Sequence, residues 1–112
     1  MHSKELIKGT IQTIILKLLA DHGRMYGYEI TQRVKELSNS EILLTEGSLY
    51  PTLHKLEAEG LLKVEEVAMG RRVRKYYTIT EPGSALVQSK IREFADFVST
   101  MNVLLQFKPG LT

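Results

Sequence analysis

Four cationic side chains within five residues are the strongest chemical feature of this sequence. They are Arg71, Arg72, Arg74 and Lys75. Guanidinium and ammonium groups attract phosphate, so such a cluster is typical of a surface that binds nucleic acid. The surrounding stretch, MGRRVRKYYTIT at 69–80, has β-branched and aromatic residues on both sides of a glycine, Gly70. We therefore expect a β-hairpin that carries these cations at its tip. The alternative is a basic turn that only faces water.

The hairpin prediction also assigns faces. Strands over 61–67 and 73–80 are joined by a turn at 68–72, and side chains alternate along each strand. Arg72 and Arg74 then share one face, so at least one of them should point at a duplex. Tyr77 lies on the other face, and we expect it to pack beneath the hairpin.

A second group of polar side chains lies on the predicted helix 46–60, EGSLYPTLHKLEAEG. One face of this helix is apolar, with leucines at 49, 53 and 56. The candidate DNA contacts on its outer surface are Ser48, Tyr50, Pro51, Thr52, His54 and Lys55. Hydroxyl and ammonium groups can contact phosphate or base edges. Bracing of the helix is an equal alternative for Tyr50, and capping of a neighbour is an equal alternative for His54.

The proline at 51 constrains where this helix begins. Proline is tolerated in the first turn, where its missing N–H has no partner. We therefore expect the regular helix to begin near Ser48, or a first turn that is distorted around Pro51.

Three further segments precede or separate these two groups. Residues 4–21 have apolar residues at helical spacing and predict one long helix, and 26–37 predict a short amphipathic one. Residues 38–45 form a polar turn with a brief extended piece at 42–44. In sequence order the chain is then three helices, a hairpin and a last helix.

The last helix starts at Thr80-Glu81-Pro82 and runs to 107. Its apolar residues at Val87, Ile91, Phe94, Val98, Met101 and Leu105 are spaced 4, 3, 4, 3, 4. This heptad spacing is typical of a helix that packs on a partner helix, so we expect a homodimer interface. Packing on its own domain is the alternative.

Composition excludes several other classes of protein. The chain has 112 residues, 43% hydrophobic and 25% charged, with a net charge of +2. It contains no cysteine and its three histidines are scattered, so we expect no metal and no cofactor. No nucleophile–base pair or phosphate loop suggests an enzyme. Without a signal peptide or a membrane span, a cytoplasmic protein is expected.

The order of elements predicts a mainly α fold with a small β-hairpin, a winged helix-turn-helix followed by a C-terminal dimerisation helix. The predicted division is 1–80 for the DNA-binding domain, 81–108 for the dimerisation helix and 109–112 for a tail. The helix at 46–60 can enter the major groove of DNA, and the hairpin reaches the flanking backbone.

Three stretches together resemble the PadR family of transcriptional regulators, in its compact form with a single last helix. They are KGTIQTIILKLLADHGRMYGYEI at 8–30, TEGSLYPTLHKLEAEGLL at 45–62 and GRRVRKYYTITEPG at 70–83. The resemblance implies a dimeric repressor whose third helix reads DNA. Many members respond to a small aromatic or drug-like ligand, which implies an effector pocket, with Phe94, Phe97, Val98 and Met101 as candidate lining. The chain departs from the family in its short wing at Ala68 and Met69, and in having no tryptophan.

The sequence thus predicts a sequence-specific DNA-binding transcriptional regulator, a homodimeric repressor on an inverted-repeat operator. A winged helix that binds only other proteins is the alternative. The basic hairpin argues against it, because such a module has no need of the cations.

Overall fold

The computed structural model describes residues 2–106, and the chain forms five helices and three strands within that range. They are α1 (Lys4–Lys8), α2 (Ile11–His22), β1 (Met25–Tyr26), α3 (Gly27–Leu37), α4 (Glu46–Ala58), β2 (Leu62–Met69), β3 (Arg72–Ile79) and α5 (Glu81–Leu105). The predicted mainly α fold with a winged helix-turn-helix is confirmed. The tail predicted at 109–112 lies outside the described residues.

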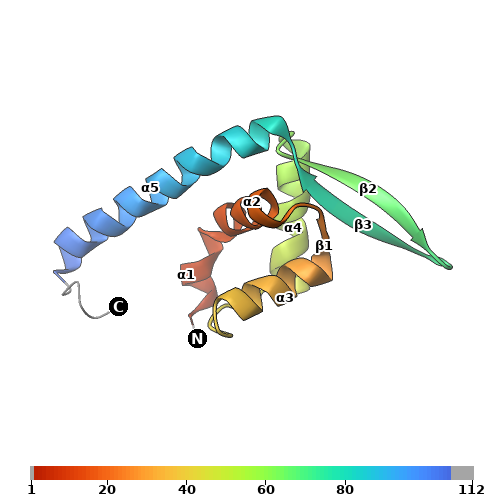
Figure 1. The fold of residues 1–112 in the computed structure, drawn as a ribbon. Coiled ribbons are helices and arrows are strands. Elements are labelled where there is room, and N and C mark those ends of the chain that lie inside the picture. Colours follow the sequence, from red (N-terminus) through yellow and green to blue (C-terminus); the bar gives the residue numbers. More distant parts are fainter. Residues whose placement is uncertain (1, 107–112) are drawn as a thin grey trace.

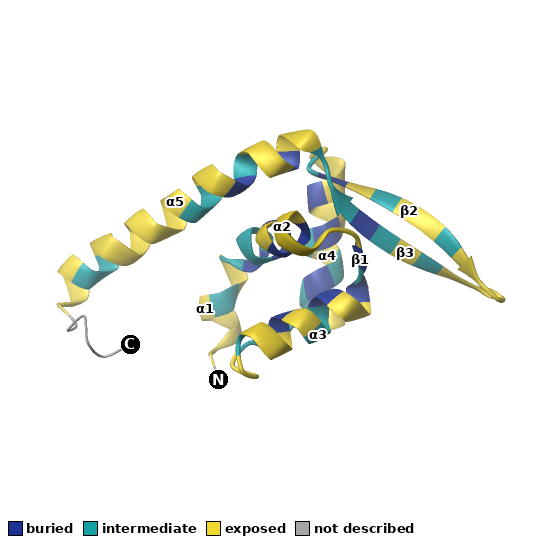
Figure 2. Cartoon of the chain, in the orientation of Figure 1, coloured by how far each residue is buried: buried dark blue, intermediate teal, exposed yellow. Residues whose placement is uncertain are grey.

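The core lies where α2, α3 and α4 meet the base of the hairpin (Figures 1 and 2). Its fully buried side chains include Ile15, Leu16, Ile30 and Leu53. They recur at helical spacing on three helices, so each helix turns one apolar stripe inward and leaves a polar face outside. Burial of these stripes is the main stabilising contribution to the domain.

The prediction of one helix over 4–21 was wrong, because the chain breaks after Lys8. The carbonyl oxygen of Ile7 accepts two hydrogen bonds, from the N–H and from the hydroxyl of Thr10, both at 2.8 Å. These bonds form a tight turn at Gly9, a residue of low helix propensity. Helix α2 starts afresh after this turn, so α1 lies at an angle to it (Figure 1).

A short strand, β1, was not predicted from the sequence. Met25 pairs with Tyr77 and Tyr26 pairs with Tyr76, which makes the hairpin a three-stranded antiparallel sheet in the order β1-β3-β2. The predicted extended piece at 42–44 forms no strand. A strand of two residues is too short to show an alternating sequence pattern. It forms because β3 has a free edge with which it can pair.

Helix α4 begins at Glu46, where the predicted helix 46–60 begins, and not near Ser48 as the proline had suggested. Pro51 lies inside the helix. Thr45 and Ser48 form a reciprocal capping box, with each side-chain oxygen 3.2 Å from the other residue's backbone nitrogen. This cap stabilises the first turn. The missing N–H of Pro51 leaves only the Gly47 carbonyl without its helical partner, and Gly47 is exposed, so water can hydrate that carbonyl.

Helix α5 starts as predicted, with Thr80 as N-cap and Pro82 in the first turn. Its first turns pack on α2, and its distal half extends beyond the rest of the molecule (Figure 1). The hairpin β2–β3 extends in the opposite direction, so the molecule measures 54 × 29 × 21 Å. Two projecting elements, one basic and one apolar, therefore flank the helical body.

Candidate nucleic-acid interface

The outer face of α4 presents a mixed polar surface. Pro51, His54 and Lys55 are exposed, and Ser48 and Thr52 are half-buried beside them. The leucines at 49, 53 and 56 are buried on the opposite side, as the sequence predicted. An exposed helical face of this kind can be inserted into the major groove without disturbing the core.

The two hydroxyl groups on this face already use their protons inside the helix. The Ser48 hydroxyl donates to the Thr45 carbonyl oxygen at 3.0 Å, and the Thr52 hydroxyl donates to the Ser48 carbonyl oxygen, also at 3.0 Å. Their oxygens keep lone pairs that can accept hydrogen bonds. In this orientation they suit amino groups on base edges better than phosphate oxygens, which accept only.

Tyr50 has a mainly structural position. It is half-buried, and its ring lies against the backbone of Gly27, where the Cζ atom is only 2.9 Å from the place that a Cβ would occupy. Tyr50 thereby fixes the start of α3 against α4. The ring of His54 lies 6.3 Å from that of Tyr50, and His54 itself is exposed.

The tip of the hairpin is a two-residue turn of Gly70 and Arg71 between the paired residues Met69 and Arg72. Gly70 has φ +66°, a left-handed conformation that favours glycine. Arg71 and Arg72 are exposed, and within residues 2–106 neither forms an ion pair. Their charges are therefore available to a partner outside the chain.

Arg74 is held within the protein instead. Its guanidinium lies 4.0 Å from the centre of the Tyr26 ring and donates a hydrogen bond of 3.4 Å to the Tyr76 hydroxyl. This hydrogen bond is the main cause that raises the pKa of Arg74 above its ordinary value. Arg74 therefore stays charged, but its position differs from that of the free arginines at the tip.

Arg24 completes this cluster, which we call the arginine–tyrosine ladder and which comprises Arg24, Tyr26, Arg74 and Tyr76. Arg24 lies 4.3 Å from the centre of the Tyr76 ring and binds Glu65 of β2 at 3.1 Å. The rings of Tyr26 and Tyr76 meet edge to face at 5.5 Å. The ladder ties the hairpin to the start of α3, because Tyr26 is the N-cap residue of that helix.

Sequence reasoning did not find Arg24 or the ladder. Alternation along the strand did predict that Tyr77 lies on the face opposite to Arg72 and Arg74 and packs beneath the hairpin, and Tyr77 is 1% exposed. The pairing with β1 could not be foreseen, and it is this pairing that brings Tyr26 beside Tyr76. Lys75 lies on the face opposite to the ladder, exposed, and pairs in register with Glu66.

The six residues of the heptad on α5 fall into two groups. Val87, at 3% exposed, and Ile91 pack on the core of their own chain. Phe94 and Val98 are 44% and 43% exposed, Leu105 is exposed and Met101 is half-buried. The distal group therefore forms an apolar surface without cover from its own domain (Figure 2).

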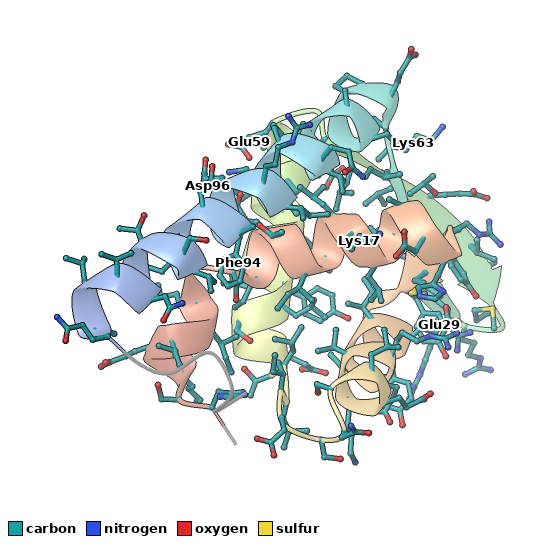
Figure 3. All side chains as sticks on the ribbon, turned by 60° about the vertical axis from the view of Figure 1, so that its left-hand side comes forward. Lys17, Glu29, Glu59, Lys63, Phe94 and Asp96 are labelled. Carbon is teal, nitrogen blue, oxygen red and sulfur yellow. The ribbon has the colours of Figure 1, made fainter. Side chains whose placement is uncertain are left out.

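A groove of about 680 Å³ lies between α1 and α5, and we call it the α1–α5 groove. Phe94 and Phe97 line it together with Leu6, Ile7 and Thr13. Figure 3 shows Phe94 on the side of α5 that faces α1, and Asp96 on the opposite side. Val98 and Met101, the other two candidates for an effector pocket, are not among the residues that line it.

Residues 2–106 contain neither a cluster of metal ligands nor a membrane-spanning helix. No three histidine, aspartate or glutamate side chains in that range lie close enough together to hold a metal ion. In the same range, no helix has the length and apolar character needed to cross a bilayer.

Comparisons with known proteins agree with this architecture. Transcriptional regulator Rv3488 of Mycobacterium tuberculosis is 38% identical over 82 residues, 73% of each chain. A transcriptional regulator from Clostridium thermocellum has a structure with a TM-score of 0.75 and 29% identity, covering 93% of this chain and 98% of that one. A PadR family transcriptional regulator from Eggerthella lenta has a structure with a TM-score of 0.77 and 29% identity. The match covers 93% of this chain and 88% of that one.

The family assignment follows from the sequence match itself. Residues 15–89 match the "Transcriptional regulator PadR-like family", and they include most of α2, the whole of α3, α4 and the hairpin, and the start of α5. This match confirms the resemblance seen in the three sequence stretches, and it agrees with a regulator rather than an enzyme. The chain belongs to the PadR-like family of transcriptional regulators.

Proposed function

We propose that this regulator is a homodimeric repressor that binds an inverted-repeat operator in double-stranded DNA. The observation that carries the proposal is the tip of the hairpin. Arg71 and Arg72 stand at the end of a strand pair that projects from the body, and they have no ion-pair partner within residues 2–106 (Figure 1). Exposed arginines on a projecting hairpin suit the phosphate backbone of a duplex.

Helix α4 supplies the base contacts in this proposal. Lys55 is a donor and suits the O6 and N7 acceptors of guanine. The hydroxyl oxygens of Ser48 and Thr52 are acceptors in their present orientation, so they suit the amino groups of adenine or cytosine. Pro51 and His54 lie on the same exposed face and would make van der Waals contacts with the major groove.

The dimer of the proposal forms through the distal half of α5. Phe94, Val98, Met101 and Leu105 would lie against the same residues of a second copy, as a two-fold interface requires. One chain offers one recognition helix, whereas a two-fold dimer offers two, about 34 Å apart. The operator would then be an inverted repeat, and a dimer bound across a promoter would exclude the polymerase.

We also propose that a small aromatic or drug-like ligand binds in the α1–α5 groove and relieves repression. The groove volume of about 680 Å³ is in the range of pockets for drug-sized ligands, and Phe94 and Phe97 provide aromatic surface. Since Phe94 also belongs to the dimer surface, an aromatic ligand bound there would alter how the two subunits meet. Such a change would alter the spacing of the two recognition helices and relieve repression.

The experiment starts with DNA fragments that the protein selects from a random pool. The binding constant for a selected duplex is then measured against salt concentration by fluorescence anisotropy. Replacing Arg71 and Arg72 by glutamine should weaken binding to all duplexes and reduce the salt slope by about 4, one for each phosphate contact that the two subunits lose. Thr52→Ala or Lys55→Ala should instead change sequence preference, by roughly 1–3 kcal/mol per lost base contact.

Two results would contradict the proposal. If no duplex is enriched in the selection, the chain is better explained as a winged helix that binds proteins. If the Arg71 and Arg72 variant keeps the affinity and the salt slope of the wild type, the hairpin has no part in DNA binding.

A further inference from the structure

A second groove lies on the other side of α1, between this helix and α4. It has a volume of about 780 Å³, and we call it the α1–α4 groove. Its α4 wall contains Ser48, Pro51, Thr52 and Lys55, which are the residues that the proposed function places in the major groove. Its α1 wall contains Lys4 and Lys8, to which the sequence assigned no role.

The charges around this groove favour an anionic occupant. Three lysines, Lys4, Lys8 and Lys55, line it with one acid, Glu5. Lys4 and Lys8 are exposed, and within residues 2–106 neither forms an ion pair. They are four residues apart on one helix, so they lie on one face of α1, about 6 Å apart along its axis. Lysine side chains are long and flexible, so the two ammonium groups can reach neighbouring phosphates of one DNA strand.

The rest of the lining suits the sugars of the same strand. Ile7, Leu43 and Pro51 give the groove apolar surface in addition to its lysines. Deoxyribose presents C–H surface between one phosphate and the next, so a DNA strand offers both anionic and apolar groups to such a lining. The groove is also continuous with the proposed base-reading face, because the two share four side chains of α4.

We infer that the α1–α4 groove seats the sugar–phosphate backbone of one DNA strand, with Lys4 and Lys8 of α1 bound to its phosphates. This inference rests on the proposed function and extends the interface from α4 and the hairpin to α1. Lys4 and Lys8 contact only phosphates in this arrangement, so they do not discriminate between DNA sequences. They fix how deeply and at what angle α4 enters the major groove.

The first test is the salt dependence of binding to a selected duplex and to a mixed-sequence duplex. The Lys4→Gln, Lys8→Gln double variant should lower the salt slope of the bound dimer by about 4 on both duplexes, and each single variant by about 2. Arginine at both positions should restore the slope. The matched control is Lys17→Gln, which removes the same charge from α2 outside the groove and should leave the slope unchanged (Figure 3).

The second test uses the absence of cysteine from the chain. Lys8→Cys places a single thiol in the groove of each subunit. It should attack a disulfide tethered to the backbone of the bound duplex, so that a protein–DNA disulfide forms and the other half of the tethered disulfide leaves as a thiol. Lys17→Cys should form none. Light scattering of the glutamine variants checks that assembly is unchanged, because α1 also lines the α1–α5 groove.

The outcomes separate this inference from the proposed function. A wild-type protein that binds DNA while the double variant keeps its full salt slope would overturn the inference and leave the function intact. A double variant that changes its assembly state, or a Lys8→Cys protein that forms no cross-link, would assign the groove to a protein contact or a small anion and would also overturn it. A wild type that binds no duplex would overturn the proposed function itself.

Discussion

At the scale of single residues, the arginines of the hairpin divide by their contacts. Arg71 and Arg72 have free guanidinium groups at the tip, whereas Arg74 is bound to two tyrosines of the arginine–tyrosine ladder. Two arginines two positions apart on the same strand face thus occupy different environments. Their charges are equal, and only their neighbours differ.

We expect Arg74→Gln and Arg72→Gln to weaken DNA binding in different ways. Arg74→Gln removes the cation–π contact with the Tyr26 ring and loosens the hairpin on α3. Affinity should fall while the salt slope stays that of the wild type. Arg72→Gln should reduce the slope by about 2, because each subunit of the dimer loses one phosphate contact. Equal reductions of the slope in both variants would show that Arg74 also contacts a phosphate.

Tyr77 gives a prediction about pH. Burial raises the pKa of its hydroxyl, and within residues 2–106 that hydroxyl has no hydrogen-bond partner. The unfolded chain releases this proton near pH 10, but the folded protein retains it to higher pH. The stability is therefore fully present below about pH 10 and falls as the pH rises above it.

The variant Tyr77→Phe removes this titrating group. Near pH 7 its free energy of unfolding should equal that of the wild type or exceed it by about 1 kcal/mol, because a buried hydroxyl without a partner is costly. Above about pH 10 it should lose less stability than the wild type does. Urea unfolding at both pH values measures this. A large loss of stability near neutral pH would reveal a hydrogen bond of that hydroxyl.

At the scale of elements, the parts with long periodic patterns were predictable and the short ones were not. Helices α3, α4 and α5 and both long strands follow from apolar spacing. The break at Gly9 depends on two hydrogen bonds to one carbonyl, and β1 depends on an edge supplied by β3. Such features arise from tertiary contacts, which local patterns do not contain.

The same limit applies to the candidate interface. The exposed face of α4 and the tip of the hairpin follow from periodicity, and the structure exposes Lys55, Arg71 and Arg72 there. The roles of Arg74 and Tyr50 depend on which side chain lies beside them. Periodicity gives the face on which a residue lies, but it does not give the neighbour from another element.

The junction between the hairpin and α5 gives a prediction at this scale. A Cβ on Gly83 would meet the carbonyl oxygen of Leu61 and the side chain of Ile79, and backbone cannot yield as a flexible side chain can. Gly83→Ala should therefore destabilise the protein by about 1–3 kcal/mol. The control is Gly9→Ala, at φ −73° with nothing within 4 Å, which should be neutral or stabilising by about 0.4–1 kcal/mol. Thermal unfolding that ranks the two variants in the opposite order would contradict this account of the junction.

At the scale of the whole molecule, the two projecting elements have complementary roles in the proposal. The hairpin extends one way and carries free cations, and α5 extends the other way and carries an exposed apolar surface (Figure 1). An apolar surface of this kind on a helix with heptad spacing is typical of a subunit contact. The contact would set the distance between the two recognition helices, and so the spacing of the operator.

The dimer is tested best at Phe94, which lies at the start of the uncovered part of α5. Phe94→Asp would place an unpaired charge between the subunits and weaken association by several kcal/mol. Light scattering should then report a 12.7 kDa monomer with helical circular dichroism. Thr100→Asp, exposed and on the opposite side of α5, should remain a dimer. A Phe94→Asp protein that stays dimeric would place the subunit contact elsewhere.

The central claim is that two copies of this chain present two α4 helices to one duplex. The most direct measurement is a hydroxyl-radical footprint of the protein on a duplex that it has selected. The account predicts two protected segments related by two-fold symmetry, with centres about 10 base pairs apart, and one dimer bound per duplex. A single protected segment, two segments in direct repeat, or no protection of any selected duplex would contradict it.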